Sequence, residues 1–134
     1  MELENVKDYQ EYDNTIIITM EYLGKCLSVN HYKYKGRYTD RRTKRWQDDL
    51  TFIIGATVGD RKFTPPVSVR VDGVFKDKRS TPDMDNLLKV INDAVKRGIG
   101  IDDKYFTNET GEPFIGGEPE LTITISGKNE KNTA

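Results

Sequence analysis

Three segments of the chain show the apolar and polar patterning of half-buried β-strands. Residues 15–23 are rich in β-branched side chains, and residues 67–75 and 120–126 alternate apolar with polar positions. Strands with one apolar side pack that side against a core. The inward-facing residues are expected to be Val67, Val69 and Val71 in the second segment and Leu121, Ile123 and Ile125 in the third.

Two other segments repeat apolar residues at the spacing of an amphipathic helix. The first covers residues 41–58, with Asp40 or Thr39 as its expected cap. The second is expected to begin at Thr81–Pro82, because Pro fits the first helical position, and to end at Gly98. The buried stripes are expected to be Trp46, Leu50, Ile53, Ile54 and Thr57 or Val58 in the first helix, and Met84, Leu87, Leu88, Ile91, Ala94 and Val95 in the second.

The order strand, helix, strand, helix and then two terminal strands predicts an α+β fold: a small mixed β-sheet packed with two main helices. A chain of 134 residues is expected to form one domain, residues 1–134. Residues 1–14 are acidic and polar, which predicts a loosely held N-terminal arm. Residues 128–134 are expected to be a disordered tail.

Cysteine content and hydropathy indicate where the protein works. The one cysteine, Cys26, excludes an internal disulfide and indicates a reducing compartment. No signal peptide heads the sequence, and no apolar run approaches the roughly 18 residues that a membrane span requires. We therefore expect a soluble cytoplasmic protein with no membrane partner.

Basic residues are concentrated although the formal net charge is −1. Between residues 28 and 38 they alternate with tyrosines. From Arg41 to Arg45 they crowd the first turns of the first helix, where the helix dipole disfavours positive charge. Such a segment can bind phosphates and stack on nucleobases; the alternative for residues 28–38 is a solvated loop whose tyrosines pack on the domain. The expected DNA-binding residues are Asn30, Lys33, Lys35, Arg37, Arg41, Arg42, Lys44, Arg45, Lys78 and Arg79.

Acidic residues flank the second helix, with Asp83 and Asp85 at its start and Asp102 and Asp103 beyond its end. The helix climbs roughly 20 Å, and five extended residues recover up to about 17 Å, so the second pair reaches the first only if the chain doubles back after Gly98. Converging carboxylates repel one another unless a cation joins them. Oxygen ligands suit Mg²⁺ or Mn²⁺, which indicates metal-assisted phosphodiester hydrolysis.

Lys89 lies four residues after Asp85 and is expected on the same exposed helix face, where its charge could stabilise a phosphate. Each charged residue also has a structural explanation. Asp83 can be a helix cap, Asp85 with Lys89 a surface ion pair, and Asp102–Asp103 a turn. A calcium loop of the EF-hand type is excluded because Leu88 occupies the position of the required Gly. Spacing alone leaves the metal site and these structural roles both open.

The run from Arg79 to Ala94 contains Asp-x-Asp-Asn-Leu-x-Lys and is followed by Asp102–Asp103. This motif resembles the RusA family of Holliday junction resolvases, and Ser28-Val-Asn30 and residues 120–125 are also similar to segments of that family. The resemblance implies a RusA-like fold and a homodimeric, Mg²⁺-dependent endodeoxyribonuclease that cuts four-way DNA junctions in recombination and repair. Carried over by position, the implied metal ligands and catalytic carboxylates are Asp83, Asp85 and Asp103, and the implied catalytic lysine is Lys89.

The chain departs from the family pattern in two places. Residues 104–117 are polar and Gly-rich where the family has an apolar strand, and residues 25–27 replace a pair of prolines. Three hypotheses follow: a junction endonuclease with one or two Mg²⁺ per site, a branched-DNA-binding module of the same fold without turnover, and a structural protein that binds no metal. For the endonuclease, the residues leave open whether one subunit or two form each site.

Overall fold

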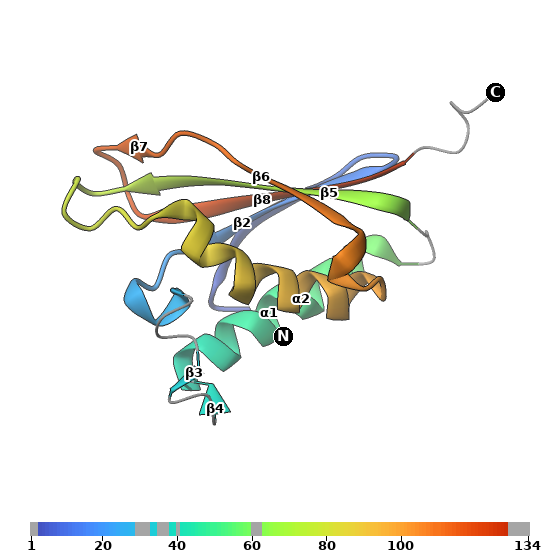
Figure 1. Cartoon of the computed structure of the whole chain (residues 1–134), viewed down its shortest axis with the longest axis horizontal. Coiled ribbons are helices and arrows are strands. Elements are labelled where there is room, and N and C mark those ends of the chain that lie inside the picture. Colours follow the sequence, from blue (N-terminus) through green and yellow to red (C-terminus); the bar gives the residue numbers. More distant parts are fainter. Residues whose placement is uncertain (1–2, 29–32, 35–37, 40, 60–62, 129–134) are drawn as a thin grey trace.

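The computed structural model describes residues 3–28, 33–34, 38–39, 41–59 and 63–128 (Figure 1). Within them, strands lie near both predicted helices, and the strands and helices with strong hydrophobic patterns appear in the predicted order. The strands are β1 (Val6–Glu11), β2 (Thr15–Glu21), β3 (Lys33–Tyr34), β4 (Tyr38–Thr39), β5 (Thr64–Phe75), β6 (Phe106–Thr110), β7 (Phe114–Ile115) and β8 (Glu120–Lys128). The helices are α1 (Arg41–Val58) and α2 (Leu88–Ile99), with 3₁₀ turns η1 (Lys25–Leu27), η2 (Met84–Leu87) and η3 (Asp103–Tyr105).

Six of the described strands form one mixed sheet in the order β1-β2-β8-β5-β6, with β7 pairing the end of β5. Both β2 and β5 are antiparallel to β8, which lies between them, so β2 and β5 run in the same direction. β6 is parallel to β5. As a result β2 and β5 end at the same end of the sheet, whereas β6 begins at the opposite end. The α+β fold expected from the sequence is confirmed.

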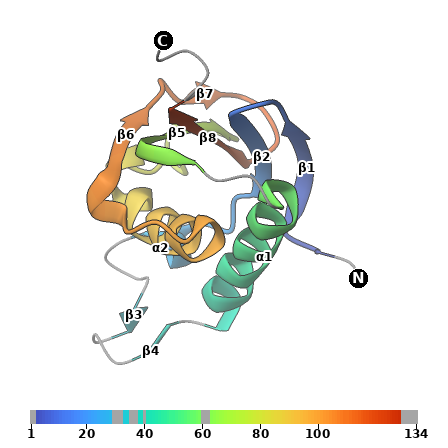
Figure 2. The ribbon, with the colours of Figure 1, turned by 90° about the vertical axis from the view of Figure 1, so that its right-hand side faces the viewer.

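Both helices lie on one face of the sheet, with α1 under the β1–β2 side and α2 under the β5–β6 side (Figures 1 and 2). The expected inward faces are confirmed, because the alternating residues of β5 and β8 are buried. Side chains of α1 also donate to backbone carbonyls of α2: Gln47 Nε2 to Val90 O at 2.9 Å and Thr51 Oγ1 to Ala94 O at 3.2 Å. The two helices and the sheet therefore share one hydrophobic core.

The N-terminal segment is not the loosely held arm that its polar composition predicts. Residues 6–11 form the edge strand β1, which pairs antiparallel with β2. Just before it, buried Asn5 donates from Nδ2 to Asp49 Oδ2 at 2.9 Å, which ties the segment to α1. Its side chains are mostly exposed because an edge strand is held by backbone hydrogen bonds and needs little apolar surface.

The first helix has the predicted bounds, and its expected apolar stripe is buried. The second begins later than the expected Thr81–Pro82, with the 3₁₀ turn η2, which is capped by Asp83. The Thr81 hydroxyl instead donates to Asp77 O. It also continues past Gly98 to Ile99, and Gly100 ends it in the left-handed conformation with φ 73°. None of the helices in the described part of the chain has the length and hydropathy needed to cross a membrane. The predicted tail lies, but for Lys128, outside the described residues.

Candidate metal and DNA-binding site

A hydrogen-bonded connection leads from β5 to η2 and carries Asp83. The Asp77 carboxylate accepts from the Ser80 backbone N at 2.8 Å and also from the Ser80 hydroxyl. These two hydrogen bonds hold the pKa of Asp77 below its usual value. The Thr81 hydroxyl closes the same turn by donating to the Asp77 carbonyl at 2.7 Å. The connection therefore has a defined path up to the start of η2.

Asp83 and Asp85 form an acidic pair at the beginning of the helical segment. Asp83 Oδ1 accepts from the Asp85 backbone N at 3.1 Å, so Asp83 is the cap of η2. Both residues are exposed. Within the described part of the chain, no hydrogen bond or ion pair engages the second oxygen of Asp83 or either carboxylate oxygen of Asp85. Three carboxylate oxygens therefore face outward from one turn.

Lys89 lies one turn further along and forms an ion pair with Asp93. Its Nζ is 3.5 Å from Asp93 Oδ1, and Lys96 Nζ is 3.8 Å from the same oxygen. The Asp93 carboxylate therefore lies between the two lysines. Its side chain is only 13% exposed, whereas both lysine side chains are much more open to solvent. The ion pair expected between Asp85 and Lys89 is replaced by one between Lys89 and Asp93, which follows it at the same i, i+4 spacing.

The second acidic pair lies beside the far end of α2. Asp102 caps η3 by accepting from the Lys104 backbone N at 3.0 Å. This hydrogen bond, followed by the interaction with Asp103 and the charges of nearby lysines, lowers the pKa of Asp102. Asp103 Oδ2 is 3.9 Å from Lys96 Nζ. Asp103 is therefore associated with Lys96, in the last turns of the helix.

The two acidic pairs do not meet within one chain. Asp83 follows the end of β5, whereas Asp103 precedes β6, which starts beside the start of β5. α2 separates them: at about 1.5 Å per residue, Lys96 lies roughly 16 Å along the helix from Asp85. Among the described residues, no group of three or more His, Cys, Asp or Glu lies close enough to hold a metal ion. A site formed within one subunit required the chain to double back after Gly98 toward Asp83 and Asp85. The chain does not do so.

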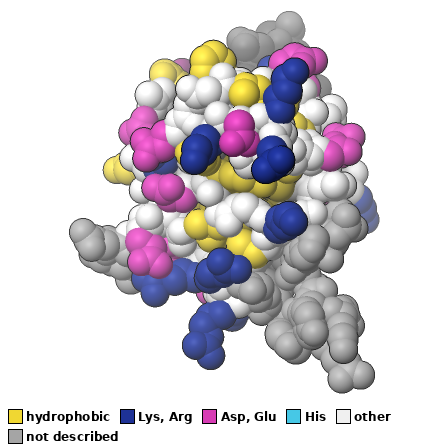
Figure 3. Space-filling model, turned by 90° about the vertical axis from the view of Figure 1, so that its left-hand side faces the viewer, with side chains coloured by type: hydrophobic (Ala, Val, Ile, Leu, Met, Phe, Trp, Pro, Cys, Tyr) yellow, Lys and Arg dark blue, Asp and Glu magenta, His cyan; other side chains and the backbone are white. Residues whose placement is uncertain are grey.

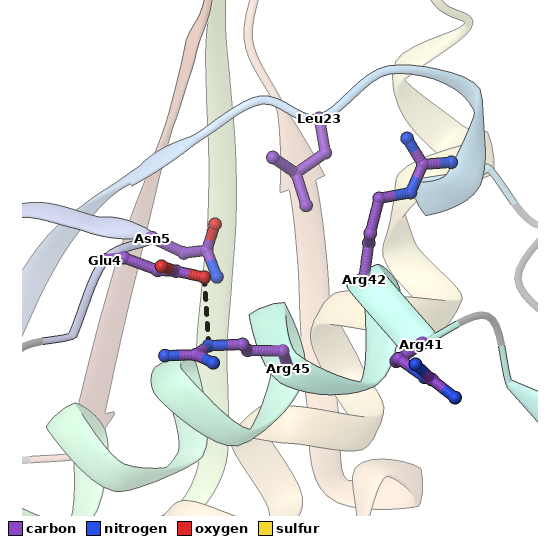
Figure 4. Close-up of a pocket in the computed structure, with 6 residues that line it drawn as sticks. All are labelled: Glu4, Asn5, Leu23, Arg41, Arg42 and Arg45. Carbon is purple, nitrogen blue, oxygen red and sulfur yellow. Dashed lines mark ion pairs between the residues drawn. The ribbon is translucent and has the colours of Figure 1, made fainter.

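The basic start of α1 surrounds a pocket of about 400 Å³ (Figure 4). Arg41, Arg42 and Arg45 line it together with Glu4, Asn5 and Leu23. Arg45 Nε pairs with Glu4 Oε1 at 2.9 Å, and Figure 4 shows the three arginines spreading in different directions rather than converging. Lys44 pairs with Asp48 at 3.3 Å. This arrangement suits several phosphates along an extended backbone better than one anion.

The remaining expected DNA-binding residues fall into two groups. Lys78 and Arg79 are exposed in the β5–η2 connection, and Arg79 lines a second pocket that also contains Asp83. Asn30, Lys35 and Arg37 lie outside the described residues, as does the side chain of Lys33 in β3. For these and for the other expected residues, DNA contact stays a prediction.

Sequence reasoning missed residues that the fold brings to Asp83. The second pocket, of about 340 Å³, is also lined by Tyr22 and Lys25, about sixty residues earlier in the chain. No local sequence pattern identifies these residues. They lie near Asp83 because β2 and β5 run in the same direction, so the segments that follow the two strands lie at the same end of the sheet. The Lys89–Asp93 pair was detectable, since its spacing equals that of Asp85 and Lys89.

Comparisons with known proteins add one family match. The model of the family described as "Endodeoxyribonuclease RusA" matches residues 28–126, which include both acidic pairs, α1 and α2. No curated protein matches the chain. Among solved structures, the periplasmic domain of Helicobacter pylori MotB is 12% identical, with 92% of this chain and 88% of that chain covered and a TM-score of 0.47. A likeness at that level carries no argument about function.

Proposed function

Because the chain belongs to the RusA endodeoxyribonuclease family, we propose that it is a Mg²⁺-dependent endonuclease that resolves four-way DNA junctions by paired phosphodiester hydrolysis. The observation that carries this proposal is the acidic pair of Asp83 and Asp85. These residues present carboxylate oxygens without protein partners among the described residues, next to exposed Lys78, Arg79 and Lys89. Acidic residues for a metal and basic residues for phosphates thus occupy neighbouring turns.

The residues present fit Mg²⁺. This ion keeps several waters and is commonly held by one or two carboxylates together with substrate phosphate oxygens. Asp83 and Asp85 would hold it, and neither is committed to a lysine or arginine in the described structure. Bound there, Mg²⁺ supplies charge compensation for the phosphate and lowers the pKa of a coordinated water.

The chain's own basic residues have separate roles in this proposal. Lys89 places a positive charge one turn from Asp85, where it stabilises negative charge on the scissile phosphate. Asp93 keeps the Lys89 ammonium on the exposed face of α2 through their 3.5 Å contact. Lys78, Arg79 and the arginines at the start of α1 bind the DNA backbone and orient the junction.

We further propose that the third carboxylate, Asp103, reaches the acidic pair from a second copy of the chain. Within one chain Asp103 lies beside Lys96, far from Asp85 along α2. In a two-fold dimer, any contact of Asp103 with the partner's helix start occurs twice, so two equivalent sites form. Two sites related by a two-fold axis match the symmetry of a four-way junction and would give symmetric cuts.

Cleavage of a synthetic four-way junction tests the proposed function. We expect Mg²⁺ to support cutting of the junction but not of a linear duplex of the same sequence, and EDTA to abolish cutting while a gel shift of the junction persists. The absence of three clustered acidic residues in the described chain favours one competing function, a branched-DNA-binding module. A junction shift without cleavage in Mg²⁺ or Mn²⁺ would contradict the nuclease and support that module.

Mixed dimers test the shared site. We expect Asp85→Asn and Asp103→Asn proteins to be inactive alone but to regain cutting when they are co-refolded in equal amounts. In a mixed dimer, one site keeps Asp85 from one subunit and Asp103 from the other, while the opposite site loses both. With random pairing, about a quarter of all sites are intact, and the products are nicks rather than paired cuts. Inactivity of the mixture, with dimers present by light scattering, would exclude a site built from both subunits.

A further inference from the structure

A pocket of about 340 Å³ opens beside Asp83 and is not explained by metal binding. One wall is the segment from Tyr22 to Ser28, and the other is the segment from Arg79 to Asn86. The walls follow β2 and β5, which end on the same side of the sheet because both are antiparallel to β8. Figure 3 views this end of the molecule: hydrophobic side chains lie near the centre of the face, with both basic (Lys, Arg) and acidic (Asp, Glu) side chains around them.

Both walls are anchored to the rest of the fold. The Tyr22 ring packs edge-on against Phe75, with centroids 5.1 Å apart and an interplanar angle of 87°, and Phe75 is fully buried. The residue before Tyr22 is held by Trp46, whose Nε1 donates to Glu21 O at 2.7 Å. The opposite wall is fixed by the hydrogen bonds between Asp77 and Ser80. The pocket is therefore formed before any ligand binds.

The lining combines the groups that a nucleotide needs. Tyr22 and Pro82 supply apolar surface, and burial raises the pKa of the Tyr22 hydroxyl above its usual value. The Asn86 carboxamide can both donate and accept, and its side chain forms no hydrogen bond with a described residue. Lys25 and Arg79 provide positive charge for flanking phosphates. An apolar body with few polar groups and a cationic lining matches a base attached to a charged backbone.

We propose that this pocket receives one unpaired nucleobase of the strand that is cut, so that a phosphate next to that base lies beside Asp83. The inference rests on the proposed function, because it takes the substrate to be DNA cut at Asp83 and Asp85. The pocket volume lies at the lower end of the roughly 300–1,000 Å³ typical of small-molecule sites, which suits a single base and excludes a duplex. Tyr22 and Asn86 are then residues that determine base preference, while Lys25 binds a flanking phosphate.

Base capture would also favour branched DNA. Extruding a base costs unstacking and unpairing energy, and this cost is least where the base is already poorly paired. The branch point of a four-way junction interrupts the stack of base pairs, so extruding a base there loses fewer stacking contacts than in a continuous duplex. The pocket thus couples recognition of a branch to recognition of a base beside the cut.

Fluorescence of 2-aminopurine tests base capture without cleavage. The probe is placed in turn at each position around the branch point, and the full-length protein is added in EDTA. We expect the emission to change at least 2-fold at one position per cut strand, and Tyr22→Leu or Asn86→Ala to reduce this change by more than half while a gel shift persists. If Tyr22→Leu unfolds the protein because it removes the Tyr22–Phe75 contact, Asn86→Ala still tests the pocket. Tyr12→Leu is the matched control, because exposed Tyr12 lies on the loop after β1.

Cleavage rates provide the second measurement. On junctions that differ only in the bases flanking the cut, we expect the wild-type protein to prefer one base at least 10-fold and Asn86→Ala to reduce this preference to about 3-fold or less. An equal response of the probe at all branch positions, or a preference unchanged in both pocket variants, would overturn the pocket assignment. If the wild-type protein binds junctions but never cuts them, the proposed function fails, and the fluorescence measurement still decides whether the pocket binds a base.

Discussion

Replacing Asp85 by Asn is expected to lower the rate of junction cleavage at least about 1,000-fold, or about 4 kcal/mol of transition-state stabilisation. The amide keeps the size of the side chain but removes a negatively charged oxygen ligand. The Asp85 side chain forms no hydrogen bond or ion pair with the described residues, so the fold is expected to be unaffected. Junction binding is expected to be unchanged or tighter, because less negative charge then faces the phosphates.

The measurement is a single-turnover cleavage rate in Mg²⁺, compared with a gel-shift Kd in EDTA. Asp8→Asn is the matched control, since Asp8 is an exposed aspartate on β1, away from the acidic pair, and its change of charge is the same. We expect Asp8→Asn to cut at the wild-type rate. An Asp85→Asn protein that cuts as fast as the control would refute the metal-ligand assignment.

The elements with strong hydrophobic patterns were predictable from the sequence. α1 has the predicted bounds and stripe because Trp46, Leu50 and Ile54 recur at the helical period and are all fully buried. The alternation in β5 and β8 likewise identified their inward faces. β1 was missed because an edge strand with five exposed residues out of six carries little apolar pattern, and its backbone pairing with β2 leaves no trace in composition.

For the candidate site, the local sequence predicted only the contacts between residues within one helical turn. Asp83 and Asp85 share one turn, so their proximity follows from spacing alone. Whether Asp103 joins them depends on where the chain goes after α2, which strand order decides: β6 is parallel to β5 and begins at the other end of the sheet. The pocket beside Asp83 also depends on strand order and was not predictable from any motif.

Gly98 shows how a residue type can be assigned to the wrong role. Glycine often ends a helix because it adopts a left-handed conformation, and on that ground Gly98 was expected to be the stop. The stop is Gly100, with φ 73°. A Cβ added at Gly98 would lie 2.6 Å from Ile54 Cγ2, 2.8 Å from Ile54 Cβ and 3.3 Å from Thr51 O. Gly98 therefore allows close approach of α2 to α1 and does not end the helix. Because α2 continues to Ile99, Asp103 follows at the end of the helix that is far from Asp85.

Gly98→Ala is accordingly expected to destabilise the protein by about 2 kcal/mol, although Ala favours a helix over Gly by about 1 kcal/mol. Ile54 is fully buried and cannot move aside cheaply, so the helices must separate or the core must distort. The measurement is the free energy of unfolding from urea titration, with an unchanged m-value as evidence that the same cooperative unit unfolds.

The matched control is Gly55→Ala in α1, which makes the same chemical change in the facing helix. A Cβ there would meet only Gly98 O, at an ordinary 3.9 Å, so we expect this variant to equal the wild type or to gain up to about 1 kcal/mol from helix propensity. The free energies of unfolding of the two variants should therefore differ by about 2–3 kcal/mol, with Gly55→Ala the more stable. Equal stability of the two proteins would mean that α2 does not pack on α1 through Gly98, and the position of Asp103 relative to Asp85 would then lose its structural basis.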